Sequence, residues 1–447
     1  MSQNSEQIFN FTSAGRCEVE AVFDEPQVTS DAGVVLVREL LERSELLRDI
    51  AAALDDDRRA GSIRHPALNI LKQRVAQICC GYFKADDGDR LRHDPAMVLA
   101  SGRIPGQDAL ASQPTVSRLE NRTTARALLR IGYAFVDDYV RSFGGKQPTM
   151  VMLDMDPTAI TVYGQQQLAL FNGFEDEYCL MPFHVYDGVT GRLIATTIRP
   201  GKTPTDREIL AILKRIVRRL RAIWPKAEIM FRADSHHTKP RVMEWMEHNG
   251  IRYVTGLGPN ARLDAQFAAT IQRARTLHAE TLREVRLYAS GHYAADSWNG
   301  QYRRVICRVL AGPLGLDTRY IVTSFQRPGA KYLYETVYCD RGNAELMIKD
   351  HKLDLGSSHA SCHQATANQF RLFLHSASYN IMHRRREALK GTELQHARFS
   401  TLQLRLLKIG ARVELKPRRI RFHLPTAFPL KEVFASLAAA FLLPLRT

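Results

Sequence analysis

Cysteine is scarce and scattered in this chain. The 447 residues include seven cysteines, an odd number, and no two of them form a C-x-x-C pair. A disulfide framework needs paired cysteines and a zinc ribbon needs closely spaced pairs, so the sequence excludes both. The chain must therefore fold around an ordinary apolar core, for which its hydrophobic content of 45% is typical.

Long apolar runs are also missing. The longest, such as the one near Phe434–Leu443, fall short of the roughly 20 residues that a membrane-spanning helix needs. The amino-terminal sequence MSQNSEQIFNF has no basic start followed by an apolar core, so we expect no secretory leader. From these absences we expect a cytoplasmic protein of bacterial type without a membrane partner.

Acidic residues are outnumbered by basic ones. Lys and Arg together number 62, Asp and Glu number 47, and the formal net charge is +15. The excess is concentrated in residues 353–447, where 15 basic and 5 acidic residues leave a local charge of +10. An excess of this size favours a polyanionic partner, most simply nucleic acid, over the alternative of a passive basic surface.

The chain is too long for one ordinary domain, and its patterning predicts three regions. Residues 1–146 are mainly helical, with apolar positions at helical spacing in 31–57, 66–80 and 122–143. Residues 147–352 combine strands and helices, and residues 353–447 form the basic region. We expect the first region to bind DNA and the last to contact DNA and to support dimerisation.

One helical segment of the first region starts with small polar residues. The stretch Ser112–Arg118 (SQPTVSR) is typical of the turn and first residues of a helix-turn-helix recognition helix. On that interpretation, Ser117 and Arg118 enter a major groove and contact DNA. An ordinary capped helix would have a similar sequence, so both interpretations stand at this point.

The pattern changes to strands at Thr149. Apolar runs and turn signals predict three strands, a helix, a strand, a helix and a strand, at 150–153, 178–186, 193–198, 205–224, 228–232, 240–249 and 252–257. That order is typical of the RNase H-like α/β fold, a mixed sheet with flanking helices. A helix and further strand-like runs follow in residues 264–316, which we interpret as a β-rich insertion.

Four polar side chains share one stripe of a predicted helix. Steps of 3, 4 and 7 separate Tyr338, Arg341, Glu345 and Lys352. With about 3.6 residues per turn, those steps keep all four side chains on one face. Charged groups are almost never buried unpaired, so the stripe is not a core pattern. One carboxylate between cations suits a helix that faces both a metal ion and a phosphate backbone.

Three aspartates accompany the ends of predicted strands. Asp154 and Asp156 are two residues apart, so on a strand they point to the same face, and Asp234 ends another strand. Adjacent parallel strands would bring these like charges together, and they would repel unless a cation lay between them. Glu345 would add a third carboxylate from the helix, and three carboxylates around one position suit Mg²⁺. A pair of such ions can activate a water or a 3′-hydroxyl and stabilise the leaving oxygen.

The spacing Y-(2)-R-(3)-E-(6)-K from Tyr338 to Lys352 resembles the signature of the DDE transposases of bacterial insertion sequences. The resemblance extends from about Val151 to Lys352, and it places a β-rich insertion between the second Asp and the Glu. In that family the first Asp ends the first strand, often as D-x-T. Asp156-Pro157-Thr158 fits that pattern better than Asp154 does, so Asp156 is the first choice and Asp154 the second.

The resemblance implies an enzyme and assigns roles to its residues. The catalytic and metal-binding residues would be Asp156 or Asp154, Asp234 and Glu345, with two Mg²⁺ or Mn²⁺ ions. The residues in contact with the phosphates of the transposon end would be Tyr338, Arg341 and Lys352. The implied partners are double-stranded DNA, as terminal inverted repeats and as target, and a second copy of the chain. The protein would then act as a homodimer on two DNA ends, beside the nucleoid.

Trp298 lies in the inserted segment, beside Asn299-Gly300. Transposases of the resembling group can use an aromatic residue there to stack on a flipped base, and such stacking contributes about 1–3 kcal/mol. A Trp that packs on a hairpin is the alternative. The sequence supports both interpretations.

Two other functions fit part of the pattern. The D-x-D-x-T motif resembles haloacid-dehalogenase-like phosphatases, in which Asp154 would be the nucleophile and Asp156 the general acid. That fold also needs a later strand ending in paired acidic residues, and Asp234 is single. A DNA-binding regulator without catalysis needs only the candidate recognition helix and the basic region. The complete set of carboxylates argues against it.

Overall fold

The computed structural model describes residues 7–56 and 58–442. Two sequence-based expectations reach beyond these ranges: the absence of a leader rests partly on residues 1–6, and the apolar run near 434–443 ends at Leu443. Within the described ranges, every helix is too short or too polar to span a membrane.

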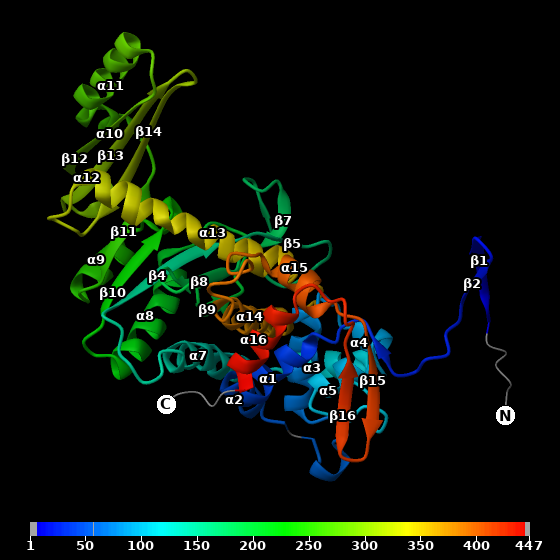
Figure 1. The fold of residues 1–447 in the computed structure, drawn as a ribbon. Coiled ribbons are helices and arrows are strands. Elements are labelled where there is room, and N and C mark those ends of the chain that lie inside the picture. Colours follow the sequence, from blue (N-terminus) through cyan, green and yellow to red (C-terminus); the bar gives the residue numbers. More distant parts are fainter. Residues whose placement is uncertain (1–6, 57, 443–447) are drawn as a thin grey trace.

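An eight-stranded mixed sheet, here called the central sheet, runs from the upper left end of the molecule toward its middle (Figure 1). Its strands follow the spatial order β12-β13-β14-β11-β10-β4-β8-β9. Their bounds are β4 Met150–Pro157, β8 Phe183–Asp187, β9 Leu193–Thr197, β10 Glu228–Ala233, β11 Arg252–Leu257, β12 Val285–Tyr293, β13 Arg303–Gly312 and β14 Gly315–Thr323. The sheet is therefore continuous across the predicted core and the predicted insertion.

The half of this sheet formed by β9-β8-β4-β10-β11 has the predicted topology. β4 is parallel to β10 and antiparallel to β8, β8 is antiparallel to β9, and β10 is parallel to β11. Two helices make the crossovers: α8 Asp206–Ile223 connects β9 to β10, and α9 Pro240–His248 connects β10 to β11. This arrangement confirms the RNase H-like α/β core.

One strand predicted from the sequence, at 178–186, is two strands in the structure. β7 Glu177–Leu180 belongs to a small sheet with β5 Ile160–Thr161 and β6 Leu170–Asn172, whereas β8 belongs to the central sheet. Pro182 lies between β7 and β8. Proline has no backbone N–H to donate to a sheet ladder, which accounts for the break.

One face of the central sheet is covered by helices. Val151 and Leu153 of β4 point to this face and share a core with α8, α9 and α7 Ala125–Arg141. α8 begins with a capping box in which Thr205 and Glu208 each accept a hydrogen bond from the other's backbone N–H. The box satisfies N–H groups that a helix start would otherwise leave unpaired.

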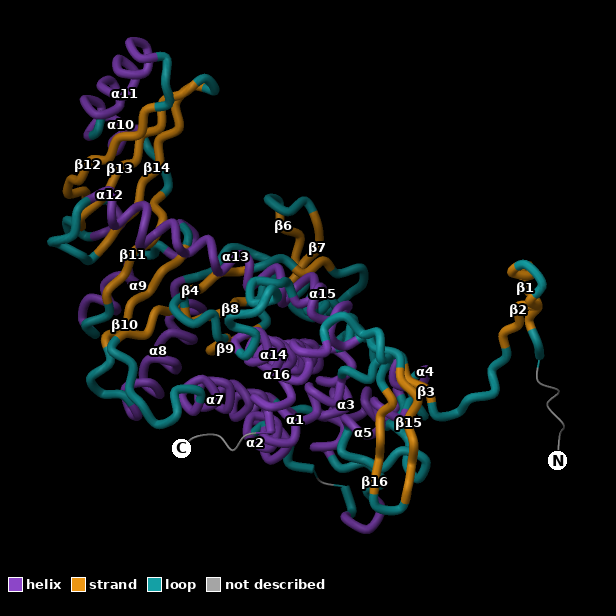
Figure 2. The backbone as a smooth tube through the Cα atoms, viewed as in Figure 1, coloured by secondary structure: helices purple, strands orange, loops and turns teal. Residues whose placement is uncertain are grey.

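On the opposite face lies a helical segment, residues 330–354, which crosses the sheet as one long run (Figure 2). Leu333 and Tyr334 anchor the segment in an apolar cluster with residues of β10, β11, β13 and β14. Successive strand residues point to opposite faces, so Asp154 and Asp156 of β4 point toward this segment. The carboxylates and the segment that carries Glu345 thus lie on the same side of the sheet.

The β-rich insertion predicted at 264–316 is continuous with the core. Its strands extend the central sheet, because β14 pairs with both β13 and β11. β14 also continues to Thr323, beyond the predicted boundary. The helix expected near 265–278 is two helices, α10 Ala261–Gln266 and α11 Ala268–Thr281, and α11 packs on β12 and β13.

The two terminal regions of the chain form one helical body. Its core draws on both, with Leu47 and Phe135 from the first and Phe370 and Phe399 from the last. The main helices are α14 Ala365–Glu387, which is buried at the centre, and around it α1 Val34–Arg43, α2 Glu45–Ala53, α3 Ala67–Cys79 and α16 Lys431–Leu442. The boundaries expected after 146 and 352 separate stretches that share a core, and the DNA-binding roles given to them stay predictions.

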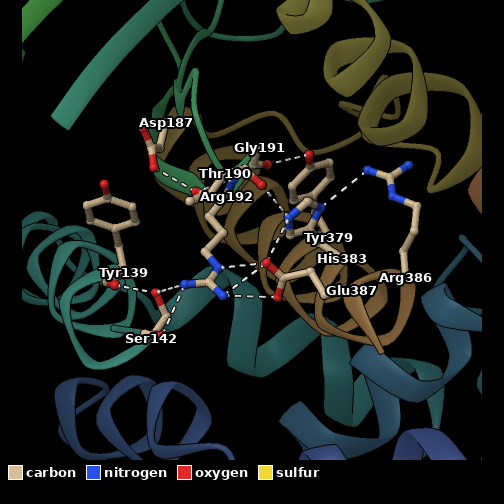
Figure 3. Close-up of polar contacts among 10 residues, drawn as sticks. All are labelled: Tyr139, Ser142, Asp187, Thr190, Gly191, Arg192, Tyr379, His383, Arg386 and Glu387. Atoms are coloured by element: carbon tan, nitrogen blue, oxygen red, sulfur yellow. Dashed lines mark hydrogen bonds and ion pairs between the residues drawn. The ribbon is translucent and has the colours of Figure 1, made fainter. Parts of the chain in front are cut away.

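The helical body is attached to the sheet at the turn between β8 and β9 (Figure 3). Arg192 donates to Ser142 Oγ at the end of α7 (2.6 Å) and forms two bonds with Glu387 of α14 (3.1 Å each). Tyr379 Oη donates to the Gly191 carbonyl at 2.8 Å. Gly191 has a φ of +75°, a conformation that favours glycine. These bonds fix the sheet relative to α14.

Two short β structures flank the helical body. The first is a sheet of β3 Val28–Thr29, β15 Ala411–Lys416 and β16 Arg419–His423. The second is a hairpin of β1 Phe9–Ala14 and β2 Cys17–Ala21, which stands away from the rest of the molecule (Figure 1). The region predicted to be mainly helical therefore begins, among the described residues, with a hairpin.

Candidate active site

Strand register brings Asp156 and Asp234 side by side. β4 and β10 run parallel, and Met155 pairs with Ala233. One step further along each strand lie Asp156, near the end of β4, and Asp234, which caps the short helical turn after β10. By alternation, both point to the face that residues 330–354 cover. The structure thus brings together two aspartates that the sequence placed at strand ends.

Arg341 and Glu345 complete a charged cluster around Asp156. Arg341 Nη1 lies 2.7 Å from Asp156 Oδ2, and Arg341 Nη2 lies 3.8 Å from Glu345 Oε1. Burial raises the pKa of Asp156 to about 7. Arg341 opposes this rise in pKa, whereas Asp234 and Glu345 add to it. Asp156 is therefore a poorly solvated carboxylate near two others, and the single cation beside it does not restore an ordinary pKa.

Asp234 is oriented by a histidine three residues later. His237 Nδ1 lies 2.8 Å from Asp234 Oδ1, and the His236 N–H donates to the same oxygen at 3.0 Å. Burial raises the pKa of Asp234, but the hydrogen bond from His237 and the nearby histidines lower it, and the net pKa lies below the ordinary value. A carboxylate accepts, so His237 Nδ1 is the donor. Contacts of this kind orient metal ligands in proteins.

Asp154 does not belong to this cluster. It is fully buried and forms two bonds with Arg232 of the adjacent strand, at 2.7 and 2.6 Å. The parallel register places Asp154 beside Arg232. Burial raises the pKa of Asp154, and the bonds from Arg232 oppose the rise. Asp154, the second choice for the first catalytic Asp, is thus a structural partner of Arg232. The phosphatase alternative, which needs Asp154 as an accessible nucleophile, loses its central residue.

The helical segment that carries Glu345 is irregular. Its parts are α12 Ala330–Tyr332, the π-helical η4 Leu333–Tyr338, the 3₁₀-helical η5 Cys339–Arg341, α13 Gly342–Lys349 and the π-helical η6 Asp350–Asp354. The regular helix expected from Tyr338 to Lys352 is therefore interrupted. Arg232 Nη1 donates to the Val337 carbonyl at 2.7 Å and competes with the helical ladder for that acceptor. Wide turns of this kind are frequent at functional sites.

Tyr338 stays beside the charged cluster. The Arg341 guanidinium lies 5.9 Å from the centre of the Tyr338 ring. The phenol reaches the end of β11 at Gly256, where an added Cβ would meet Tyr338 Oη at 2.8 Å. Glycine at this position permits the close approach. The first three members of the predicted stripe therefore lie together in the structure.

Lys352 lies on the other side of Asp156 from Asp234. It is half-buried in η6, and its charge helps to lower the pKa of His184, for which burial is the larger cause. His184 of β8 is paired with Asp156 of β4, whereas Asp234 follows β10 on the opposite side of β4. A cation there suits a phosphate of a strand that passes over Asp156.

Trp298, for which the sequence supported both base stacking and packing, is packed in this structure, and its contact with DNA stays a prediction. Trp298 is only 4% exposed. Its ring contacts Tyr293 edge-to-face at 5.5 Å, and the Arg303 guanidinium covers it at 5.3 Å from the ring centre. The ring is part of the packing of the insertion, as the alternative interpretation held.

Ser117 and Arg118 lie on α6 Gln113–Arg122. Arg118 is exposed, whereas Ser117 is half-buried and its hydroxyl accepts a hydrogen bond from within the helix. The preceding helix, α5 Pro95–Ala100, is separated from α6 by residues 101–112, a connection much longer than the turn of about 3–4 residues in a helix-turn-helix. α5 and α6 do not form that motif, and DNA contact by α6 stays a prediction.

In the part of the chain that the structure describes, no group of three or more His, Cys, Asp or Glu side chains is arranged to hold a metal ion. The Arg341 guanidinium lies against Asp156 instead. The donor set nevertheless fits Mg²⁺ or Mn²⁺, because Asp156, Asp234 and Glu345 offer carboxylate oxygens, and a cation between them would relieve the repulsion that helps to raise the pKa of Asp156. Movement of Arg341 would open the position.

Sequence reasoning did not single out Arg232 and His237. Arg232 lies inside an otherwise apolar strand, and a charged residue there needs a partner on a neighbouring strand. His237 follows a strand-ending Asp at a distance of three residues, which lets its ring reach back to the carboxylate. Both signals are present in the sequence, but each of them becomes specific only when the neighbouring strand is known.

Comparison with known proteins identifies the family. The family described as transposase DDE domain group 1 matches residues 11–445. No curated protein sequence matches the chain significantly. Among solved structures, the chain is similar to the piggyBac transposase in its synaptic complex with hairpin DNA, at 12% identity and a TM-score of 0.42, over 85% of this chain and 80% of that one. By the family match, this chain belongs to transposase DDE domain group 1, and it is a DNA transposase.

Proposed function

We propose that this transposase cleaves phosphodiester bonds at the ends of an insertion sequence and transfers the freed 3′-hydroxyl to target DNA. Asp156, Asp234 and Glu345 are the catalytic carboxylates of the proposal. The observation that carries it is the position of Asp156: the parallel register of β4 and β10 places it beside Asp234, and Arg341 links it to Glu345 on the helical segment. A carboxylate with only a structural role would be fully paired, as Asp154 is with Arg232.

Each residue of the cluster has a task in this proposal. The three carboxylates would hold two Mg²⁺ or Mn²⁺ ions, which activate a water or a 3′-hydroxyl and stabilise the leaving oxygen. His237 holds Asp234 in one orientation. The Glu345 side chain is 57% exposed and free to turn toward Asp156. Arg341 leaves Asp156 and, with Tyr338 and Lys352, contacts phosphates of the transposon end.

The partners in this proposal are two kinds of double-stranded DNA, the terminal inverted repeats and the target. A chain with a net charge of +15 suits such polyanions. Two transposon ends need two catalytic clusters, so the active form is a homodimer. We place the reaction in the cytoplasm of a bacterial-type cell, where the DNA is.

A cleavage assay tests the proposal. The DNA that flanks the open reading frame is searched for matching inverted repeats, and a duplex carrying one repeat is incubated with protein and Mg²⁺. We expect Mg²⁺-dependent cleavage at the end of the repeat and none in a duplex with a scrambled repeat. Binding of the correct duplex by folded protein without any cleavage would favour the regulator instead.

Addition of Mg²⁺ is expected to stabilise the wild-type protein against thermal unfolding, because an ion that binds only the folded state adds its binding free energy to stability. The ion must displace the proton from Asp156, whose pKa is raised to about 7. The stabilisation should therefore grow as the pH rises from about 6 to about 8 and then level off. Asp156→Asn is the matched control. An equal Mg²⁺ effect in this variant would remove Asp156 from the ion site.

Replacing Lys352 by Ala is expected to weaken binding of duplex DNA regardless of its sequence. One lost phosphate contact should reduce the slope of log affinity against log salt concentration by about 0.9. Lys226→Ala is the control, since Lys226 is exposed in the loop before β10, at the opposite end of the parallel strands from Asp156. Titrations at several salt concentrations measure both slopes, and equal slopes for the two variants would exclude a phosphate contact at Lys352.

A further inference from the structure

The hairpin of β1 and β2 is exposed along its whole length. Every residue from 7 to 26 is exposed, on both strands and in the turn between them. Figure 1 shows the hairpin apart from the helical body, to which it is joined through β3 and its pairing with β15. An isolated two-stranded hairpin is at best marginally stable in water. Its formation therefore requires a surface to pack against.

One face of the hairpin is apolar and the other is acidic. Paired residues of antiparallel strands share a face, and the register pairs Phe9 with Ala21 and Phe11 with Val19. Phe23 extends this face and contacts Phe9 edge-to-face at 6.0 Å. The other face carries Asn10, Glu18 and Glu20, with Ile8 and Val22 at the base of the hairpin. The hairpin thus has the alternation of a strand pair with one buried face, and this chain leaves that face open.

The charge of the hairpin differs in sign from that of the rest of the chain. Residues 7–26 contain four acidic residues and one basic residue, a net charge of −3, within a chain of net charge +15. DNA would repel such a segment, whereas the basic remainder of this protein attracts it. Charge therefore favours a protein surface of the same composition as this chain over nucleic acid.

We propose that the hairpin, residues 7–26, is an arm that docks its apolar face on a second copy of this chain and holds the two copies together. Its base is fixed to the helical body through β3, and its apolar face is turned to solvent, so a neighbouring copy can receive it without any change in the core. The proposal rests on the proposed function in one respect, that two DNA ends require two copies.

Sedimentation of the full-length protein without DNA tests the arm. Phe11→Asp places a negative charge on the apolar face of the hairpin. Asn10→Asp places the same charge at the adjacent residue, whose side chain lies on the acidic face. We expect the wild type and Asn10→Asp to sediment as dimers and Phe11→Asp as a monomer. Val19→Asp, on the opposite strand of the same face, should behave as Phe11→Asp does. The far-UV spectrum and main unfolding transition should not change, since the hairpin lies outside the core.

Three outcomes would disprove the proposed role of the hairpin: a monomeric wild type, a dimeric Phe11→Asp, or an equal loss of dimers in Asn10→Asp. The result is independent of the catalytic proposal, because no DNA is present. A protein that cleaves the repeat but shows no arm-dependent dimer would disprove only the arm. A protein with an arm-dependent dimer that never cleaves would disprove only the proposed function.

Discussion

Replacing Glu345 by Gln is expected to lower the rate of end cleavage by at least about a thousandfold, a loss of about 4 kcal/mol in transition-state stabilisation. Gln has the size of Glu but no charge, so it is a poor ligand for a divalent ion. The Glu345 side chain is 57% exposed, and its ion pair with Arg341 is long, at 3.8 Å. The free energy of unfolding should therefore change by less than about 0.5 kcal/mol. Cleavage and thermal unfolding are measured on the same preparation.

Glu335→Gln is the matched control for this variant. Glu335 lies earlier on the same helical segment, where Tyr288 Oη donates to its carboxylate. The substitution makes the same change of charge but does not touch the cluster around Asp156, so cleavage should stay at the wild-type rate. If Glu345→Gln also cleaves at that rate, Glu345 is not catalytic.

The RNase H-like core was predictable because each of its elements carries a local signal. Alternation along β4 separates an apolar face from a polar one, and a capped amphipathic helix, α8, follows at residues 206–223. Pairing between distant strands has no such signal. The strands of the insertion were predicted one by one, but only the pairing of β14 with β11 shows that they are part of the central sheet.

The members of the candidate site were predictable, but the roles of Asp154 and Asp156 were not. Both lie on one strand and point to one face, so the local sequence pattern predicts the same role for both residues. The residue that separates them is Arg232, which lies 78 positions later and binds Asp154.

Asn substitutions of Asp154 and Asp156 are expected to have opposite effects on stability. Asp154→Asn removes the charge that balances buried Arg232, and the free energy of unfolding should fall by about 3–5 kcal/mol. Asp156→Asn removes an anion whose pKa is raised to about 7 by burial and by Asp234 and Glu345. In the metal-free protein at pH values above that pKa, repulsion from these two carboxylates opposes the single ion pair of Asp156 with Arg341, whereas Arg232 makes two bonds to Asp154. The free energy of unfolding of this variant should therefore stay the same or rise.

The effects on cleavage should be reversed. At a temperature where both variants are folded, Asp156→Asn should not cleave the repeat, whereas Asp154→Asn should cleave at the wild-type rate per folded molecule. Denaturant unfolding without metal gives the stabilities, and cleavage is normalised to the folded fraction. A stable Asp154→Asn without activity, beside an active Asp156→Asn, would make Asp154 the catalytic residue. In the expected result, one strand holds a carboxylate that stabilises the fold and, two residues later, one that opposes folding and serves catalysis.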